Sequence, residues 1–453
     1  MATATTPGEA PPSLPPEDPQ YREHILGVPT RGRFFFGWYL VSAGAAIQFL
    51  VGALMSNVIG GYATALTNDF GWSRSSLSLG FALSRVESGI LGPFQGWMID
   101  RFGPRAIMRF GLTVFGIGLF LFSQIQNLPM FYVAFLMMAV GSSLGGFMSM
   151  TVAVVNWFSR ARSRALGISQ AGMAVGGLAA SGVIYLIIEV GWREVSFVSG
   201  IIVLCVGLPL TTFIVRKPEE LGLTVDGHDE AMRTRLATQD AARNRKSTDT
   251  DIDFTTREAL RARAFWTISL GHASALFVVG AVMLHLVLHL TESRGYSAVA
   301  ASSFVLVMTI CQLVGQIGGA ALGDFVSKRL IVVVCMAMHT VAILLLANVD
   351  GTLAVLAFTV LHGLAWGTRG PLMQAMRADY FGRSSFGKIM GFSSAVTMIG
   401  ITAGQLIPGI LYDRTGSYTL GFTIIAAIAA MGSIFFVLST RPPAPVRTSV
   451  SEP

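Results

Sequence analysis

Long apolar segments recur along the chain and are separated from one another by short polar loops. A bilayer core about 30 Å thick needs a helix of about 20 apolar residues, and most of these segments reach that length. One longer polar stretch, 216–263, leaves six apolar segments on either side of it. The pattern predicts an all-α membrane protein with twelve transmembrane helices in two six-helix bundles. The predicted spans are 36–63, 75–99, 106–123, 130–156, 165–188, 195–215, 264–290, 299–322, 330–348, 352–377, 387–411 and 418–438.

The polar segments set the expected domain limits. Residues 1–33 are rich in Pro, Thr and Glu without apolar periodicity, which predicts a disordered tail. No cleavable signal is expected, because the first apolar run is too long for one. Near the end of the central polar stretch, Phe254, Leu260, Phe265 and Trp266 alternate with arginines, which predicts a basic amphipathic helix on the membrane surface. We therefore expect bundles over 34–215 and 264–440, a linker over 216–263 and tails over 1–33 and 441–453.

Composition and charge favour lipid rather than water around most of the chain. Of all residues, 52% are hydrophobic and 13% charged, whereas soluble domains average about 25% charged. If the N-terminus is cytoplasmic, 26 of the 32 Lys and Arg residues lie in cytoplasmic segments and 4 in outside loops. This bias predicts a cell-membrane protein whose termini and linker are cytoplasmic. It also explains the net charge of +7 without a nucleic-acid partner, since the basic residues face anionic lipid.

The two halves of the chain share landmarks at a nearly constant offset, which indicates a duplicated unit. Asp100 follows the second predicted span, and Asp324 follows the eighth, 224 positions later. Residues 157–160 (Trp-Phe-Ser-Arg) follow the fourth span, and residues 380–383 (Tyr-Phe-Gly-Arg) follow the tenth, 223 positions later. The shared register predicts two pseudo-symmetric halves, an arrangement typical of secondary transporters, whose substrate site lies between the halves near the membrane midplane.

The loop after the second predicted span resembles the loop signature of the major facilitator superfamily. It reads Gly-x-x-x-Asp-Arg-x-Gly-x-Arg over residues 96–105. In that family the Asp lies near the start of the eleventh helix and helps to latch the cytoplasmic gate. A carboxylate is favoured at a helix N-terminus by the helix dipole, and neighbouring arginines can neutralise it. The resemblance therefore implies gate roles for Gly96, Asp100, Arg101, Gly103 and Arg105, and the repeat extends this prediction to Asp324.

Shorter patches are similar to the monocarboxylate-porter branch of that superfamily, which has oxalate-type relatives. They lie at residues 70–74, 156–172, 258–266 and 413–418. The branch's substrate residues do not carry over by position. Proton-coupled animal members have a Lys in the first helix and an Asp/Arg pair in the eighth. Here Asn57 lies near the place of that Lys, the span 299–322 has no charge, and Lys388 lies only at the edge of the span 387–411.

Ionisable residues at membrane depth are unfavourable, which makes them candidates for function. Arg85 and Glu87 lie about halfway along the second predicted span and point to different faces, because they are two residues apart. His362 and Arg369 lie seven residues apart on the tenth span and share a face, with Trp366 between them. A guanidinium can hold a carboxylate with two hydrogen bonds. We therefore predict a substrate site made of Arg369, His362, Trp366, Arg85 and Asn57, with Glu87 or His362 as the proton-coupling residue.

Structural roles remain open alternatives for these residues. Arg85 could form an ion pair with another helix, and Arg369 could be a contact near the cytoplasmic gate. His272 and His339 are expected to be packing residues. His285 and His289 are four residues apart, which would suit a metal, but a wet rim at the outer end of their span explains them better.

These observations predict a secondary active transporter of a small organic anion, a mono- or dicarboxylate, that works by alternating access as a monomer in the lipid bilayer. Its coupling partner is expected to be a proton or a counter-anion. An exporter of hydrophobic or cationic compounds is the alternative, which the buried acid Glu87 suits. A membrane sensor would need a soluble signalling domain, for which the linker is too short and polar. Neither an enzyme nor a cofactor or metal is expected, because no nucleophile–base pair or phosphate loop is visible and Cys205, Cys311 and Cys335 lack metal-ligand spacing.

Overall fold

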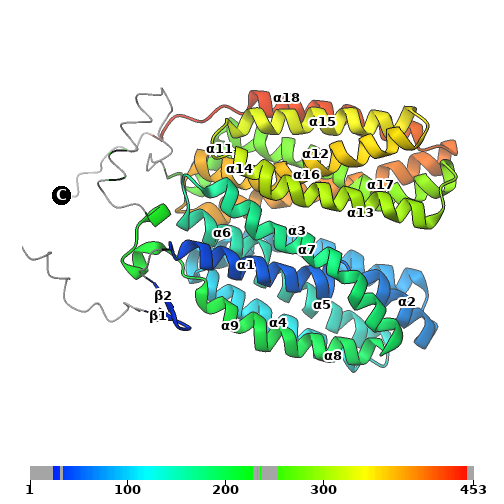
Figure 1. Ribbon diagram of the computed structural model, residues 1–453, viewed down its shortest axis with the longest axis horizontal. Helices are drawn as coiled ribbons and strands as arrows, with labels where there is room; N and C mark the ends of the chain where they lie inside the picture. The colour runs from blue at the N-terminus through cyan, green and yellow to red at the C-terminus, as the bar shows by residue number, and fades with distance from the viewer. Residues whose placement is uncertain (1–23, 31–33, 228–231, 233–234, 236–252, 446–453) are drawn as a thin grey trace, which may run out of the picture.

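The computed structural model describes residues 24–30, 34–227 and 253–445, together with Met232 and Arg235. The side chains of Arg74, Ser75, Ser78 and residues 81–90 lie outside this description. The described chain forms two bundles of long helices that lie side by side, joined at one end by the linker (Figure 1). The predicted all-α membrane fold is confirmed.

The helical stretches coincide with the twelve predicted spans. The first half contains β1 (His24–Ile25), β2 (Val28–Pro29), α1 (Gly37–Val51), η1 (Gly52–Ser56), α2 (Ile59–Phe70), α3 (Arg74–Phe102), α4 (Pro104–Ser123), α5 (Leu128–Gly145), α6 (Phe147–Trp157), α7 (Arg162–Glu189), α8 (Trp192–Ile202), η2 (Val203–Gly207), α9 (Leu208–Leu210) and η3 (Thr211–Phe213). The linker and second half contain η4 (Pro218–Leu221), η5 (Val225–Gly227), α11 (Thr256–Arg261), α12 (Arg263–Leu288), η6 (His289–Ser293), α13 (Ala298–Val314), η7 (Gly315–Gly319), α14 (Ala320–Leu322), α15 (Lys328–Asn348), α16 (Thr352–Phe381), α17 (Phe386–Thr415) and α18 (Thr419–Leu438).

Within the described residues, ten helical stretches are long and apolar enough to cross a membrane. The helices α3 and α16 are as long, with 29 and 30 residues, but they contain charged residues. Several stretches run further than predicted, among them α2 to Phe70 and α17 to Thr415. These two end at a glycine with positive φ, Gly71 at 65° and Gly416 at 68°, because a left-handed residue without a Cβ is the usual helix stop.

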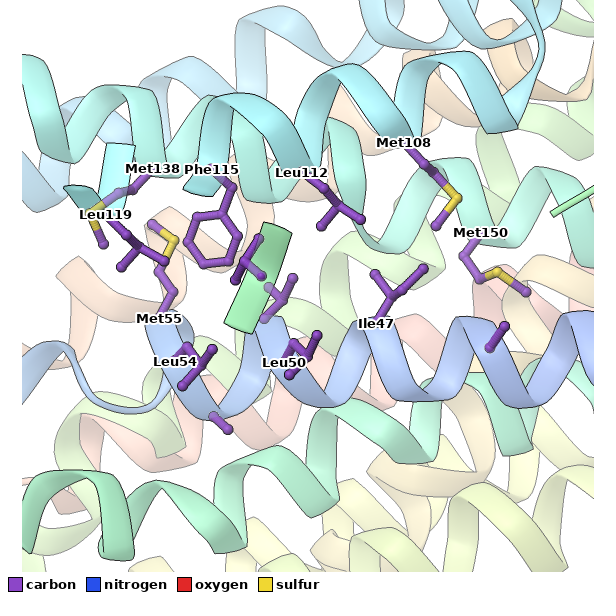
Figure 2. Close-up of a cluster of buried hydrophobic side chains, with 14 of the residues drawn as sticks. Ile47, Leu50, Leu54, Met55, Met108, Leu112, Phe115, Leu119, Met138 and Met150 are labelled. Atoms are coloured by element: carbon purple, nitrogen blue, oxygen red, sulfur yellow. The ribbon is translucent and has the colours of Figure 1, made fainter. Parts of the chain in front are cut away.

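Each bundle has its own apolar core. In the first bundle, side chains of α1 and η1 meet those of α4, α5 and α6 in a continuous layer (Figure 2). The residues labelled there are Ile47, Leu50, Leu54, Met55, Met108, Leu112, Phe115, Leu119, Met138 and Met150. Glycines bring α4 and α5 close together, since a Cβ on Gly111 would collide with the backbone of Gly145. Such close backbone contact replaces the hydrophobic driving force that is missing between helices in lipid.

A third cluster joins the bundles at the end where the linker lies, called the linker end below and seen on the left in Figure 1. Its members come from α3, α4, α5 and α6 on one side and from α16 and α17 on the other. They are Ile99, Ile107, Leu144, Met148, Val152, Val155, Ala378, Phe386 and Met390. Because these side chains are buried between the bundles, the molecule is closed at the linker end.

The tails and linker differ in part from the prediction. Residues 24–29 of the expected disordered tail form a β-hairpin, in which Ile25 is buried in the first core. In the expected amphipathic segment, α11 covers only Thr256–Arg261, and Phe254 and Phe265 face the protein instead of lipid. Trp266 remains 46% exposed. Residues 1–23, 31–33 and 446–453 of the predicted tails and much of the linker lie outside the described residues, and the predicted domain limits stay predictions.

Candidate functional site

Asp100 connects the two bundles at the linker end. Its Oδ1 accepts a hydrogen bond from the backbone N–H of Gly387 at 3.0 Å, and its Oδ2 accepts one from Lys388 at 3.0 Å. Both N–H groups belong to the first turn of α17, where backbone donors lack partners inside the helix and the dipole favours an anion. The structure therefore places Asp100 at the start of the eleventh span, where the family resemblance expected it.

Asp324 makes the corresponding contact in the other half. Its Oδ1 accepts from the backbone N–H of Ser163 at 3.0 Å and its Oδ2 from that of Arg164 at 3.4 Å, at the start of α7. Burial raises the pKa of Asp324 above the usual value for aspartate, although these hydrogen bonds and Lys328 act in the opposite direction. The two carboxylates and the two helix starts that they cap are both related by the offset of 224 found in the sequence.

Glycines allow the crossing helices to approach at these contacts. A Cβ on Gly96 of α3 would collide with the carbonyl oxygen of Gly387, and a Cβ on Gly167 of α7 would collide with that of Gln316. The other residues of the predicted gate loop stay within the first half. Gly103 turns the chain between α3 and α4 with a φ of 83°, and Arg101 is exposed. Arg105 donates to the carbonyl oxygens of Thr212 at 2.7 Å and Ile214 at 2.8 Å.

A buried ion network lies beside Asp324 and was missed by the sequence analysis. Asp379 of α16 pairs with Arg162 of α7 and with Lys328 of α15, the latter at 2.8 Å. Arg383 donates to the carbonyl oxygen of Asn156 at 3.1 Å and forms an ion pair with Glu219 at 2.9 Å. The contacts Arg162–Asp379 and Arg383–Asn156 join the two halves, and no local sequence signal shows them, because Arg162 and Asp379 are 217 positions apart.

Arg369 lies inside the second bundle on α16 and is 1% exposed. Its Nε and Nη1 atoms are buried without a hydrogen-bond partner. Among the side chains that the structure describes, no Asp or Glu forms an ion pair with it. Trp366, one turn before it, is only half-buried. The site therefore holds a positive charge that the described protein leaves without a counter-charge.

His362 is fully buried on the same helix and faces a second histidine. Its Nδ1 lies 3.1 Å from Nδ1 of His339 on α15, and the ring of Trp366 lies 6.0 Å away, edge to face. His339 was expected to be a packing residue, and no sequence pattern predicted this pair. The contact joins two different helices, which periodicity along either helix does not predict.

Arg377 is a second buried guanidinium on α16, at 2% exposure. Unlike Arg369 it has partners: it donates to Nδ1 of His272 at 2.9 Å, to Oγ of Ser393 at 3.0 Å and to Oε1 of Gln374 at 3.1 Å. It lies at the last position of the predicted span 352–377. Its contacts to α12 and α17 make it a structural residue of the second bundle.

The remaining predicted site residues lie elsewhere. Arg85 and Glu87 are on α3, which packs against α5 and α17, and their side chains are outside the described part. Asn57 is exposed and donates to the carbonyl oxygen of Gly52 in its own helical stretch at 2.9 Å. The described residues contain no group of three His, Cys, Asp or Glu side chains able to hold a metal ion.

Two pseudo-symmetric helical bundles, with buried charged groups and with helix starts capped by aspartates of the opposite half, are typical of a membrane transporter. The family model of the Major Facilitator Superfamily matches residues 44–367 and 289–453. The chain therefore belongs to the major facilitator superfamily and is a multi-pass membrane transporter, as the loop signature implied.

Curated relatives agree with the branch resemblance. The chain is 23% identical over 408 residues to the oxalate:formate antiporter of Oxalobacter formigenes, covering 88% of this chain and 91% of that protein. It is 25% identical over 373 residues to monocarboxylate transporter 13 of Bos taurus, covering 79% of this chain and 77% of that protein. It is also 25% identical over 425 residues to the gentisate transporter of Corynebacterium glutamicum, covering 90% and 88%.

Solved structures share the fold at low identity. The proton:xylose symporter XylE, bound to 6-bromo-6-deoxy-D-glucose, superposes with a TM-score of 0.71 at 14% identity, covering 89% of this chain and 95% of that one. The human organic anion transporter MFSD10 superposes with a TM-score of 0.64 at 16% identity, covering 88% and 97%. These likenesses support the helical arrangement and carry no information on the substrate.

Proposed function

We propose that the protein carries a small organic anion, a mono- or dicarboxylate, across a cell membrane by alternating access. The observation that carries the proposal is the buried guanidinium of Arg369, whose Nε and Nη1 have no partner. A charge buried without a counter-charge is strongly unfavourable in a low-dielectric interior. An anionic ligand supplies that counter-charge, and a carboxylate can accept two parallel hydrogen bonds from one guanidinium.

The relatives support this substrate class. Their names specify oxalate and formate, monocarboxylates, and gentisate, all of which carry a carboxylate. Arg369 is buried while the linker end is closed, so an anion reaches it only when the helices around α16 move. Trp366, one turn before Arg369 on α16, is half-buried.

The gate contacts suit alternating access. Asp100 and Asp324 each hold the start of a helix of the opposite half, so breaking them frees the linker end to open. With the termini and linker in the cytoplasm, as the Lys and Arg distribution predicts, this conformation is closed to the cytoplasm. One chain contains both halves and both latches, so we propose that the monomer is the transporting unit.

Uptake into proteoliposomes tests the proposal. Purified full-length protein is reconstituted, and entry of labelled oxalate, formate and gentisate is measured with and without a pH gradient. We expect saturable uptake of at least one carboxylate that unlabelled carboxylates inhibit. Transport of the lipophilic cation ethidium, with no uptake of any carboxylate, would favour the rival exporter function instead.

A further inference from the structure

The histidine pair beside Arg369 has unused hydrogen-bonding capacity. His339 and His362 are both 0% exposed, their ring centroids are 4.7 Å apart, and their Nδ1 atoms are 3.1 Å apart. The Nε2 atom of each ring is buried without a hydrogen-bond partner. Buried polar atoms in native structures nearly always have partners, so two such atoms on one pair need an explanation.

The bridging contact determines the protonation state of the neutral pair. A hydrogen bond between the two Nδ1 atoms requires a proton on one of them and a lone pair on the other. The donor ring then has a bare Nε2 lone pair, and the acceptor ring carries its proton on Nε2. One further proton from water can add to the bare Nε2, and the bridge between the rings stays intact. The pair is therefore built to change its charge by one unit without losing its internal hydrogen bond.

The charged groups near the histidine pair determine when binding of that further proton is favourable. Arg369 lies seven residues after His362 on α16, about 10 Å along the helix, and its side chain extends back toward the N-terminal end. Within their apolar runs, the neighbouring helices also carry Cys335 of α15, Cys311 of α13 and, on α12, His285 and His272, which accepts from Arg377. Toward the linker end, α12, α15 and α16 carry Arg263, Lys328, Arg329, Arg377, Asp379 and Tyr380, while α18 contains no ionisable residue. Within the described residues, no carboxylate offsets the positive charge of Arg369.

We propose that the His339–His362 pair is the proton-binding element of the transporter and takes up one proton when an anion occupies Arg369. With Arg369 unliganded, a proton on the pair places two positive charges near each other in a low-dielectric interior. An anion on Arg369 removes this repulsion. The linkage is reciprocal, so protonation of the pair raises the affinity for the anion by the same factor. The coupling therefore moves anion and proton in the same direction.

This inference rests on the proposed function, and one titration separates the two. Full-length protein in detergent is titrated calorimetrically with oxalate, formate and gentisate, each in two buffers of different ionisation enthalpy. The comparison yields both the dissociation constant and the number of protons bound with the anion, after correction for the ligand's own protonation. We expect about one proton per anion, and an affinity that weakens by up to about tenfold per pH unit as the pH rises.

Substitution of each histidine tests whether the pair binds the proton. In His339→Gln and His362→Gln the proton uptake should fall to zero, while the anion still binds at alkaline pH. A purely structural role would lower the yield of folded protein but leave the proton stoichiometry of the folded fraction unchanged. The matched control is His285→Gln, another buried histidine, which contacts the carbonyl oxygen of Gln405 and should retain full proton uptake.

The possible results distinguish the histidine proposal from the proposed anion transport. Anion binding without proton uptake, or uptake that persists in both pair variants, overturns the histidine proposal and leaves the anion transporter standing. If none of the three anions binds to wild-type protein and none is taken up by proteoliposomes, the proposed function fails and the histidine proposal fails with it.

Discussion

Arg369 and Arg377 lie eight residues apart on α16, and both guanidiniums are buried, but their surroundings differ. Arg377 donates to His272, Ser393 and Gln374, so its removal leaves several buried acceptors unpaired. Arg369 has two nitrogen atoms without partners. A buried charged side chain with unpaired polar atoms lowers the stability of the protein. Such residues are typical of binding sites, where stability is lost in favour of function.

At this scale we predict opposite stability effects for two matched variants. Arg369→Gln should raise the thermal midpoint of the ligand-free protein, because it removes a buried charge without a counter-charge, and should abolish carboxylate binding. Arg377→Gln should lower the midpoint, because each buried group left unpaired lowers the free energy of unfolding by about 1–3 kcal/mol. Arg369→Lys keeps the charge but loses the two-pronged geometry, so affinity should fall about tenfold. Thermal unfolding with and without oxalate measures both effects; unchanged carboxylate affinity in Arg369→Gln would make Arg369 a structural contact.

The elements that matter most are the starts of α7 and α17. Each is capped by an aspartate from the opposite half of the chain, in a geometry repeated by the internal symmetry. The glycines at the crossings let the helices approach closely enough for these bonds to form. These capping hydrogen bonds cross from one half of the chain to the other, so they are lost when the bundles separate at the linker end. Closure of the linker end and capping of these two helices therefore occur together.

We predict that Asp100→Asn destabilises the closed linker end by about 1 kcal/mol, the usual contribution of a cap. The readout is maleimide labelling of a cysteine at position 390, in a variant that lacks Cys205, Cys311 and Cys335. Met390 is 2% exposed in the closed state, so the substitution at Asp100 should increase the labelling rate at position 390 about fivefold. Transport should fall without loss of membrane insertion. Asp413→Asn, at the exposed far end of α17, is the control; normal transport in Asp100→Asn would remove its latch role.

The linker end should also respond to pH through Asp324. Because burial raises the pKa of this carboxyl in the closed state, the closed state binds the proton more tightly than an open state in which the carboxyl meets water. Closure is therefore most stable below the ordinary aspartate range and weakens as the pH rises through the raised pKa. Labelling at position 390 should accelerate as the pH rises above the ordinary aspartate range, and Asp324→Asn should flatten this dependence. An equally steep profile in Asp324→Asn would assign the titration to another group.

The whole molecule combines two duplicated bundles with a polar linker at one end. The linker contacts both halves: Asp226 accepts hydrogen bonds from the backbone of Ser159 and Arg160, and Asp253 accepts from Arg383 and Ser384. These contacts lie on the two loops that the sequence repeat had related. The basic residues of the chain gather mainly at this end, which is the basis of the predicted orientation.

For the molecule in its membrane, we predict that the linker end faces the cytoplasm. A cysteine-free variant carrying Asp240→Cys should resist a membrane-impermeant maleimide in intact cells and react after permeabilisation. A cysteine at Asn127, in the loop before α5 at the opposite end, should react in intact cells. Labelling at position 240 from outside intact cells would reverse the topology.

The sequence alone determined the helices, the duplication and the family. A membrane helix satisfies its backbone hydrogen bonds internally, so apolar runs of spanning length locate it without knowledge of the fold. The repeat register likewise anticipated where Asp100 and Asp324 lie. The ends of α2 and α17 were placed too early, because the prediction followed hydropathy while the helices continue to their glycine stops.

The tertiary structure decided which buried polar groups have partners. Arg369 and Arg377 lie on the same predicted span, yet only packing against α12 and α17 supplies partners for Arg377. His339 and His362 are 23 positions apart, and Arg162 and Asp379 are 217 apart. Helical periodicity relates residues on one helix, whereas these pairs depend on how different helices are positioned against each other, and that is set by the packing of the whole bundle.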